Sequence, residues 1–225
     1  MKLVFSRFVF VLALLLPITI ISKEVRTEYT VSTKGFKIGE LVWYIKTENN
    51  YFENKIILKS GGLFSSLYKF SGEYFSSGII EGSRFYSEKY YHKWLTEKKE
   101  KEMKIFFNNK KISSIKQKPL ENEVARIDIF DLVEYSDPLT SFLNILNDKG
   151  SSHTVDGRRV YTMVKYDNLK IEVGSTILIK NYNNIWADHK RNDLEKINFS
   201  IGPNQVLPEF IEIHFKGNVF KVFKN

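Results

Sequence analysis

The stretch SDPLTSFLNILN, residues 136–147, decides the architecture, because here a chain that otherwise reads as strands switches to the spacing of a helix. Asp137 can cap the free N–H groups of a first helical turn, and Pro138 suits the first helical position because it has no N–H of its own. The apolar residues recur at i, i+3, i+4 and i+7, namely Leu139, Phe142, Leu143 and Leu146. We predict a short helix from Pro138 to Asn147 whose apolar stripe covers the concave face of a sheet.

On both sides of this helix the pattern has period two, which is typical of strands with one buried face. Upstream, Met103, Ile105 and Phe107 alternate with other side chains, and the turn residues 108–110 lead into a second run over 112–115. Downstream, Asp156-Gly157 precedes an alternating run over 160–166. Each pattern predicts a hairpin.

The remaining C-terminal sequence continues in the same way. We expect a turn at Asp167-Asn168 before a strand over 169–173, and strands over 210–215 and 219–223 around a turn at 216–218. Residues 63–68 follow two glycines and leave a second short helix open. The fold class is therefore mainly β, a curved antiparallel meander or half-open barrel with one short helix around 138–147.

Residues 1–22 have the order of a secretory signal peptide: the basic residues Lys2 and Arg7, an apolar run over 8–16, and a polar break from Pro17. The apolar segment of about 14 residues is short for a membrane-spanning helix, which needs about 20. We expect cleavage after Ser22, an uncleaved anchor being the alternative, and a single β-rich domain over 23–225 in the periplasm.

The chain contains no cysteine. This excludes lipoprotein acylation, disulfides and thiolate chemistry. The net charge of +8 falls to +6 once Lys2 and Arg7 are subtracted. An exported basic protein meets a lipid or another envelope component before nucleic acid, so we expect no nucleic acid partner and no membrane span after cleavage. An amino-acid composition rich in Lys, Asn, Ile, Phe and Tyr explains the charge without any partner, and we prefer this explanation.

The order of several short motifs resembles the exported bacterial family catalogued as domain of unknown function 3108. The motifs are Tyr29-Thr30-Val31, Gly35 and Gly39 before Leu41, Ser60-Gly61-Gly62-Leu63, Gly78 and Gly82 before a tyrosine-rich strand, Asp137-Pro138-Leu139-Thr140-Ser141, and Asp156-Gly157-Arg158-Arg159. The family's usual proline after Gly82 is missing. The resemblance implies a periplasmic antiparallel β fold, similar to the curved, half-open sheets of lipoprotein carriers, and assigns no catalytic residue.

The sequence itself contains little catalytic chemistry. His92, His153, His189 and His214 are far apart, and none has the spacing of a metal site, so we expect neither metal nor cofactor. The polar loop 181–193 could hold an acid–base pair in Asp188-His189 and Asp193, although such residues are ordinary in loops. No nucleophile elbow, phosphate loop or zinc-protease motif is present.

Aromatic residues make up 15% of the chain and cluster at Tyr86, Tyr90, Tyr91 and Trp94. These side chains suit a cleft for a lipid chain or a sugar, but we favour the interpretation that they pack the core of a sheet and its cross-strand pairs. We interpret the protein as a non-enzymatic envelope protein that binds an apolar ligand or an envelope partner on a curved sheet. A periplasmic hydrolase acting on cell-wall or lipid substrates is the alternative.

Overall fold

The computed structural model describes residues 22–66, 68–167, 174–186 and 193–225. Thirteen strands of these residues form one sheet, with a single α-helix, α2, over Pro138–Leu146. Two short 3₁₀ turns cover Gly62–Ser66 and Ile129–Asp131. The strands are β1 Ser22–Thr33, β2 Phe36–Glu48, β3 Tyr51–Ser60, β4 Phe70–Glu81, β5 Arg84–Thr96, β6 Glu100–Asn108, β7 Lys111–Lys118, β8 Ser151–Val155, β9 Arg159–Asp167, β10 Ser175–Asn184, β11 Leu194–Ser200, β12 Phe210–Phe215 and β13 Asn218–Lys224.

The sheet is an antiparallel meander in which chain neighbours are also sheet neighbours, with one long-range pairing. β13 pairs with β1, so the first and last strands meet in the middle of the sheet and β7 and β8 form its edges. The predicted hairpins β6–β7, β8–β9 and β12–β13 are confirmed. The strand expected over 169–173 lies outside the described residues.

The edge strands do not pair with each other, but a short segment spans the gap between them. Val133 forms a bridge with Lys111 of β7, and Ser136 forms one with Thr154 of β8. The Ser136 N–H donates to His153 O, and the Val155 N–H donates to Ser136 O, both at 2.9 Å. The sheet therefore stays open as a half-barrel, and the segment that covers its seam leads directly into α2.

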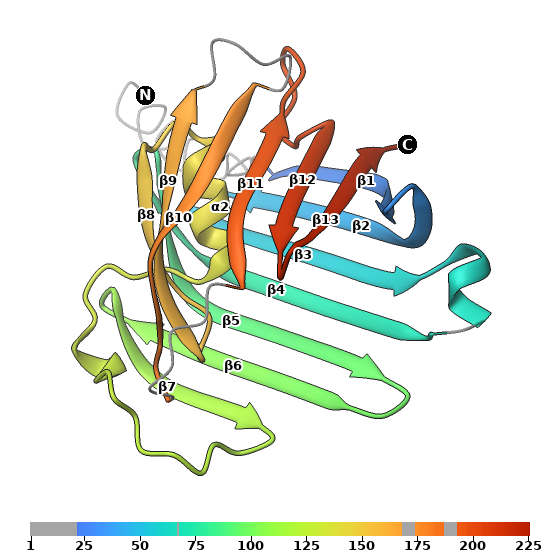
Figure 1. Cartoon of the computed structure of the whole chain (residues 1–225). Coiled ribbons are helices and arrows are strands. Elements are labelled where there is room, and N and C mark those ends of the chain that lie inside the picture. The colour runs from blue at the N-terminus through green and yellow to red at the C-terminus, as the bar shows by residue number, and fades with distance from the viewer. Residues whose placement is uncertain (1–21, 67, 168–173, 187–192) are drawn as a thin grey trace, which may run out of the picture.

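Helix α2 lies inside the curve of the sheet, between the wall formed by β1 to β7 and the wall formed by β8 to β13 (Figure 1). Its apolar side chains Phe142, Leu143 and Ile145 join a core with buried Tyr29, Trp43 and many smaller residues. The predicted helix and the predicted coverage of the concave face are confirmed. Residues 62–66, the region left open above, form a 3₁₀ turn.

The N-terminus of α2 is fixed by Asp137, whose side chain is fully buried. Its Oδ1 accepts the N–H groups of Leu139 and Thr140 at 2.9 and 3.0 Å, as predicted for the cap. Its Oδ2 contacts the hydroxyls of Ser76 on β4 and Ser87 on β5 at 2.7 and 2.6 Å, and that of Thr140 at 2.6 Å. The carboxyl group thus joins the helix to two strands.

The contacts of Asp137 Oδ2 bear on its protonation. The Ser76, Ser87 and Thr140 hydroxyls donate to Oδ2, and a proton on the carboxyl group would supply a further hydrogen for the contact between Ser76 and Thr140, at 2.7 Å. Burial raises the pKa of Asp137 and so favours the protonated form, against the opposing effect of the hydrogen bonds from Ser87, Thr140 and Ser76.

The polar face of α2 is buried as well, which the sequence did not predict. Asn144 imitates a strand residue: its amide oxygen accepts the Phe85 N–H and its amide nitrogen donates to Phe85 O, both at 2.9 Å. Ser141 accepts a hydrogen bond of 2.8 Å from Thr154 of β8. Because buried polar groups must find partners, these bonds fix the rotation of the helix inside the sheet.

We expect Asp137→Asn to fold with near-normal stability and Asp137→Leu to lose about 3 kcal/mol or more, because only the amide can replace both acceptor and donor contacts. Since the folded pKa of Asp137 is raised above 3.8, the folded wild type binds the extra proton, and its stability falls as pH rises above about 4. Urea unfolding of wild type and Asp137→Asn from pH 4 to 8 measures this. A stability difference between the two that grows in favour of wild type with rising pH would contradict the assignment.

Candidate functional site

A largely apolar cavity of about 450 Å³ lies on the concave face, beside the N-terminal turn of α2. Its volume is in the range of pockets that hold small organic molecules. Its apolar lining comes from both walls of the half-barrel and from α2: Leu41, Trp43, Ile56, Leu58, Pro138, Leu139, Phe142, Met163, Leu194, Ile197, Ile211, Ile213, Phe215 and Val222. The helix fills the other end of the half-barrel, where Asn144 and Asn147 bind the β4–β5 turn region.

Five polar side chains also line the cavity, namely Tyr74, Tyr90, His92, Asp156 and Tyr161. Among the described residues, the hydroxyls of Tyr74 and Tyr161 have no hydrogen-bond partner. Burial raises the pKa of Tyr74 to about 12 and that of Tyr161 well above its ordinary value. Both phenols therefore stay protonated at neutral pH and offer hydrogen bonds to whatever occupies the cavity.

His92 and Tyr90 form a pair on the inner face of β5. The Tyr90 hydroxyl lies 3.1 Å from His92 Nδ1, and the two rings meet edge to face. Burial lowers the pKa of His92, as do the nearby Arg158, Lys101 and Arg159, while Asp156 acts in the opposite direction. The imidazole is therefore neutral at physiological pH.

Asp156 lies in the turn between β8 and β9 and is engaged by that turn. Its Oδ1 accepts the N–H groups of Arg158 and Arg159 at 2.8 and 2.7 Å, and its Oδ2 pairs with the Arg159 guanidinium at 3.3 Å. Gly157 adopts a φ of +86°, and a Cβ there would clash with Met103. The predicted Asp-Gly turn is confirmed, and its N–H groups and the Arg159 guanidinium occupy both oxygens of the carboxylate.

The four aromatic residues singled out in the sequence divide between the two faces of β5. Tyr90 lines the cavity, and Trp94, on the same face, stacks on Phe70 with ring centroids 5.3 Å apart. Tyr91 and Tyr86 instead lie under the amines of Lys104 and Lys110. The structure therefore brings two of the four to the concave face.

The cavity residues that sequence reasoning missed are Tyr74, His92, Asp156 and Tyr161. Strand alternation contained a signal for one of them, because Tyr90, His92 and Trp94 share a face of β5. The others come from β4, β9 and the β8–β9 turn, and only the curvature of the sheet brings them together.

The remaining histidines and the polar loop contribute nothing to the cavity as described. His153 and His214 contact Thr162 and Glu212 on their own sheet surfaces, whereas Asp188 and His189 lie outside the described residues. Over the described ranges, no three His, Asp or Glu side chains lie close enough to hold a metal ion.

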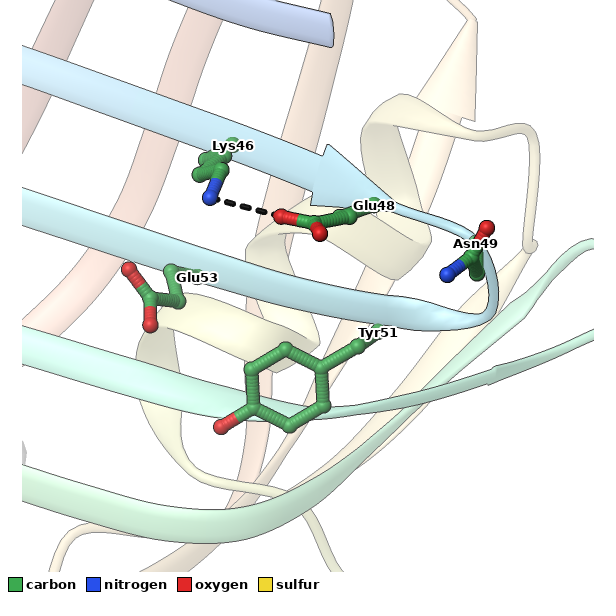
Figure 2. A pocket seen from close by; sticks show the side chains of 5 residues that line it. All are labelled: Lys46, Glu48, Asn49, Tyr51 and Glu53. Atoms are coloured by element: carbon green, nitrogen blue, oxygen red, sulfur yellow. Dashed lines mark ion pairs between the residues drawn. The ribbon is translucent and has the colours of Figure 1, made fainter. Parts of the chain in front are cut away.

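A second hollow lies at the β2–β3 hairpin and is lined by Lys46, Glu48, Asn49, Tyr51 and Glu53 (Figure 2). Lys46 and Glu48 pair at 2.7 Å, and Figure 2 shows their side chains and that of Glu53 on the surface of the hairpin. Lys46 and Glu48 are partly exposed to solvent, so this hollow would bury little apolar surface of a ligand. We therefore take the concave cavity as the candidate site.

The sequence matches the family described as Protein of unknown function (DUF3108) over residues 28–186. The chain belongs to this family. The match runs from within β1 to the end of β10 and includes α2, the Asp137 cluster and the Asp156-Gly157 turn. No curated protein matches the chain. A solved structure to which the chain shows similarity is the "Beta-barrel-like Protein of Domain of Unknown Function DUF1849 from Brucella abortus", with 13% identity, a TM-score of 0.48, and coverage of 89% of this chain and 95% of that one.

The pKa of His92 gives a direct test of the cavity's electrostatics. We expect an NMR titration of labelled histidine, assigned with His92→Gln, to give a value below 6.5 in the folded protein and an ordinary value in urea. Asp156→Asn removes the neighbouring negative charge and should lower the pKa further. A folded-state value at or above 6.5 would mean that His92 is not held in a buried, cationic surrounding.

Proposed function

We propose that this protein is a non-enzymatic binding protein of the bacterial envelope that holds a small apolar ligand in the concave cavity. One observation carries the proposal: the cavity is walled by aliphatic and aromatic side chains, and the hydroxyls of Tyr74 and Tyr161 on its lining make no hydrogen bond to the described residues. Both hydroxyls can donate to a molecule inside the cavity. A ligand with an apolar body and a hydrogen-bond acceptor would satisfy both hydroxyls.

The chemistry of the cavity favours binding over hydrolysis. Asp156 is engaged by backbone N–H groups and by Arg159, and His92 is hydrogen bonded to a phenol whose pKa burial raises well above its usual range. No serine or threonine belongs to the described lining. A hydrolase needs a nucleophile, or a water beside a base, held in place by a third group. The arrangement supports a binding role instead.

We also propose that the protein works in the periplasm. The N-terminal signal pattern and the absence of cysteine support export without lipid attachment. Among the described residues, no helix is both long and apolar enough to cross a membrane.

The binding proposal predicts that filling the cavity abolishes ligand uptake. Leu58 of β3 lines the cavity, so Leu58→Trp should weaken binding of the neutral fluorophore N-phenyl-1-naphthylamine by about tenfold or more, which corresponds to about 1.4 kcal/mol. Fluorescence titration measures the dissociation constant, and circular dichroism checks the fold.

The matched control is Ile57→Trp, which adds the same side chain to the next residue of β3. Successive residues of a strand point to opposite faces, so Ile57 lies on the outer surface and its variant should bind the probe like the wild type. Equal binding by the two variants, or no binding by the wild type, would contradict the proposal.

Export predicts a defined N-terminus. After expression in a Gram-negative host, intact-mass analysis of the periplasmic fraction should give a chain that begins at Lys23, the residue after the expected cleavage site. Recovery of a full-length chain from the membrane fraction would support the uncleaved anchor instead.

A further inference from the structure

The mouth of the cavity has a cationic residue on the β6 side that is not neutralised. His92 of β5 pairs with Met103 of β6. Two residues further along, near the end of β5 and the start of β6, Trp94 pairs with Lys101. His92 lines the cavity and Met103 is buried in the core. Because residues two apart in a strand share a face, Trp94 and Lys101 lie on the concave side, two residues beyond the cavity lining, and Lys101 is exposed.

The opposite side of the mouth carries three further cations, and each has an acidic partner. Arg158 pairs with Glu121 at 3.1 Å. Arg159 pairs with Asp156 and with Asp193, both at 3.3 Å, and Lys216 reaches the same Asp193 at 3.6 Å.

Lys101 differs from these three residues, since within the described ranges no carboxylate pairs with it. The described residues just named are four cations and three acids, and Lys101 is the cation of this set that pairs with none of the three acids. Glu100 and Glu102, the acidic neighbours of Lys101 in sequence, are on the other face of β6, where they pair with Lys93, Lys104 and Lys118.

Strand alternation places Lys101 on the side that faces the opposite wall. Its pKa agrees with this position: burial lowers it, as does repulsion from Arg158, Lys99, Arg159 and Lys216. Lys101 in turn contributes to the lowered pKa of His92 inside the cavity. An anion at the mouth would relieve this repulsion, whereas a second cation would increase it.

We infer that the ligand is an anionic amphiphile whose apolar chain occupies the cavity and whose carboxylate or phosphate head group binds Lys101 at the mouth. This inference rests on the proposed binding function and adds the chemical class of the ligand. Tyr74 lies beside His92, with ring centroids 5.7 Å apart, and its hydroxyl would donate to an oxygen of the head group. The charged head group remains at the rim, where water still reaches it and its desolvation is small.

The test compares three ligands with the same chain and different heads: dodecanoate, dodecyl phosphate and dodecanol. Isothermal titration with the full chain should show that at least one anion binds about tenfold or more tightly than dodecanol, and that this preference weakens as salt is added. The better of the two anions distinguishes a carboxylate site from a phosphate site.

Lys101→Met should reduce the preference for the anion over dodecanol to about twofold or less, and Lys101→Arg should restore it. The matched control is Lys104→Met, the same change on the outer face of β6, which should keep the full preference. Equal affinity for all three ligands, or equal effects of the two methionine variants, would overturn the inference while leaving the binding function intact. Failure of all three to bind or to displace the neutral fluorophore would overturn both.

Discussion

The buried carboxyl group of Asp137 is the contact on which the rest of the structure depends. A single side chain caps the helix through two N–H groups and binds hydroxyls on β4, β5 and α2. Without these contacts the polar face of α2, with Thr140 and Asn144 almost fully buried, could not enter the concave side of the sheet. The helix is therefore held by specific hydrogen bonds as well as by its apolar stripe.

The position of α2 explains why a cavity exists at all. The Asn144 and Asn147 side chains bind the β4–β5 turn region, so the C-terminal half of the helix fills one end of the half-barrel. The N-terminal turn contributes Pro138 and Leu139 to the cavity at the other end. A sheet open along the β7–β8 seam and filled at one end thus leaves an apolar space that its own side chains do not occupy.

Most of the fold could be predicted from the sequence because its signals are local. The Asp137-Pro138 cap, the helical spacing and the alternating hairpins each lie within a few neighbouring residues. The pairing of β1 with β13 and the burial of Asn144 could not be predicted from the sequence, because both depend on partners far away in the chain. For the site, the aromatic cluster pointed to Tyr90. The cavity itself required the curvature that brings Tyr74 and Tyr161 together.

The central claim is that the concave cavity is a binding site for an amphiphile. A crystal structure tests this claim most directly, with protein that is purified without detergent from its native host or with crystals that are soaked with dodecanoate. The account predicts continuous chain-like density between Leu58 and Phe142, an acceptor atom within hydrogen-bond distance of the Tyr74 or Tyr161 hydroxyl, and a head group beside Lys101. A cavity that is closed by rearranged side chains, or that holds only water while the ligand lies elsewhere, would contradict it.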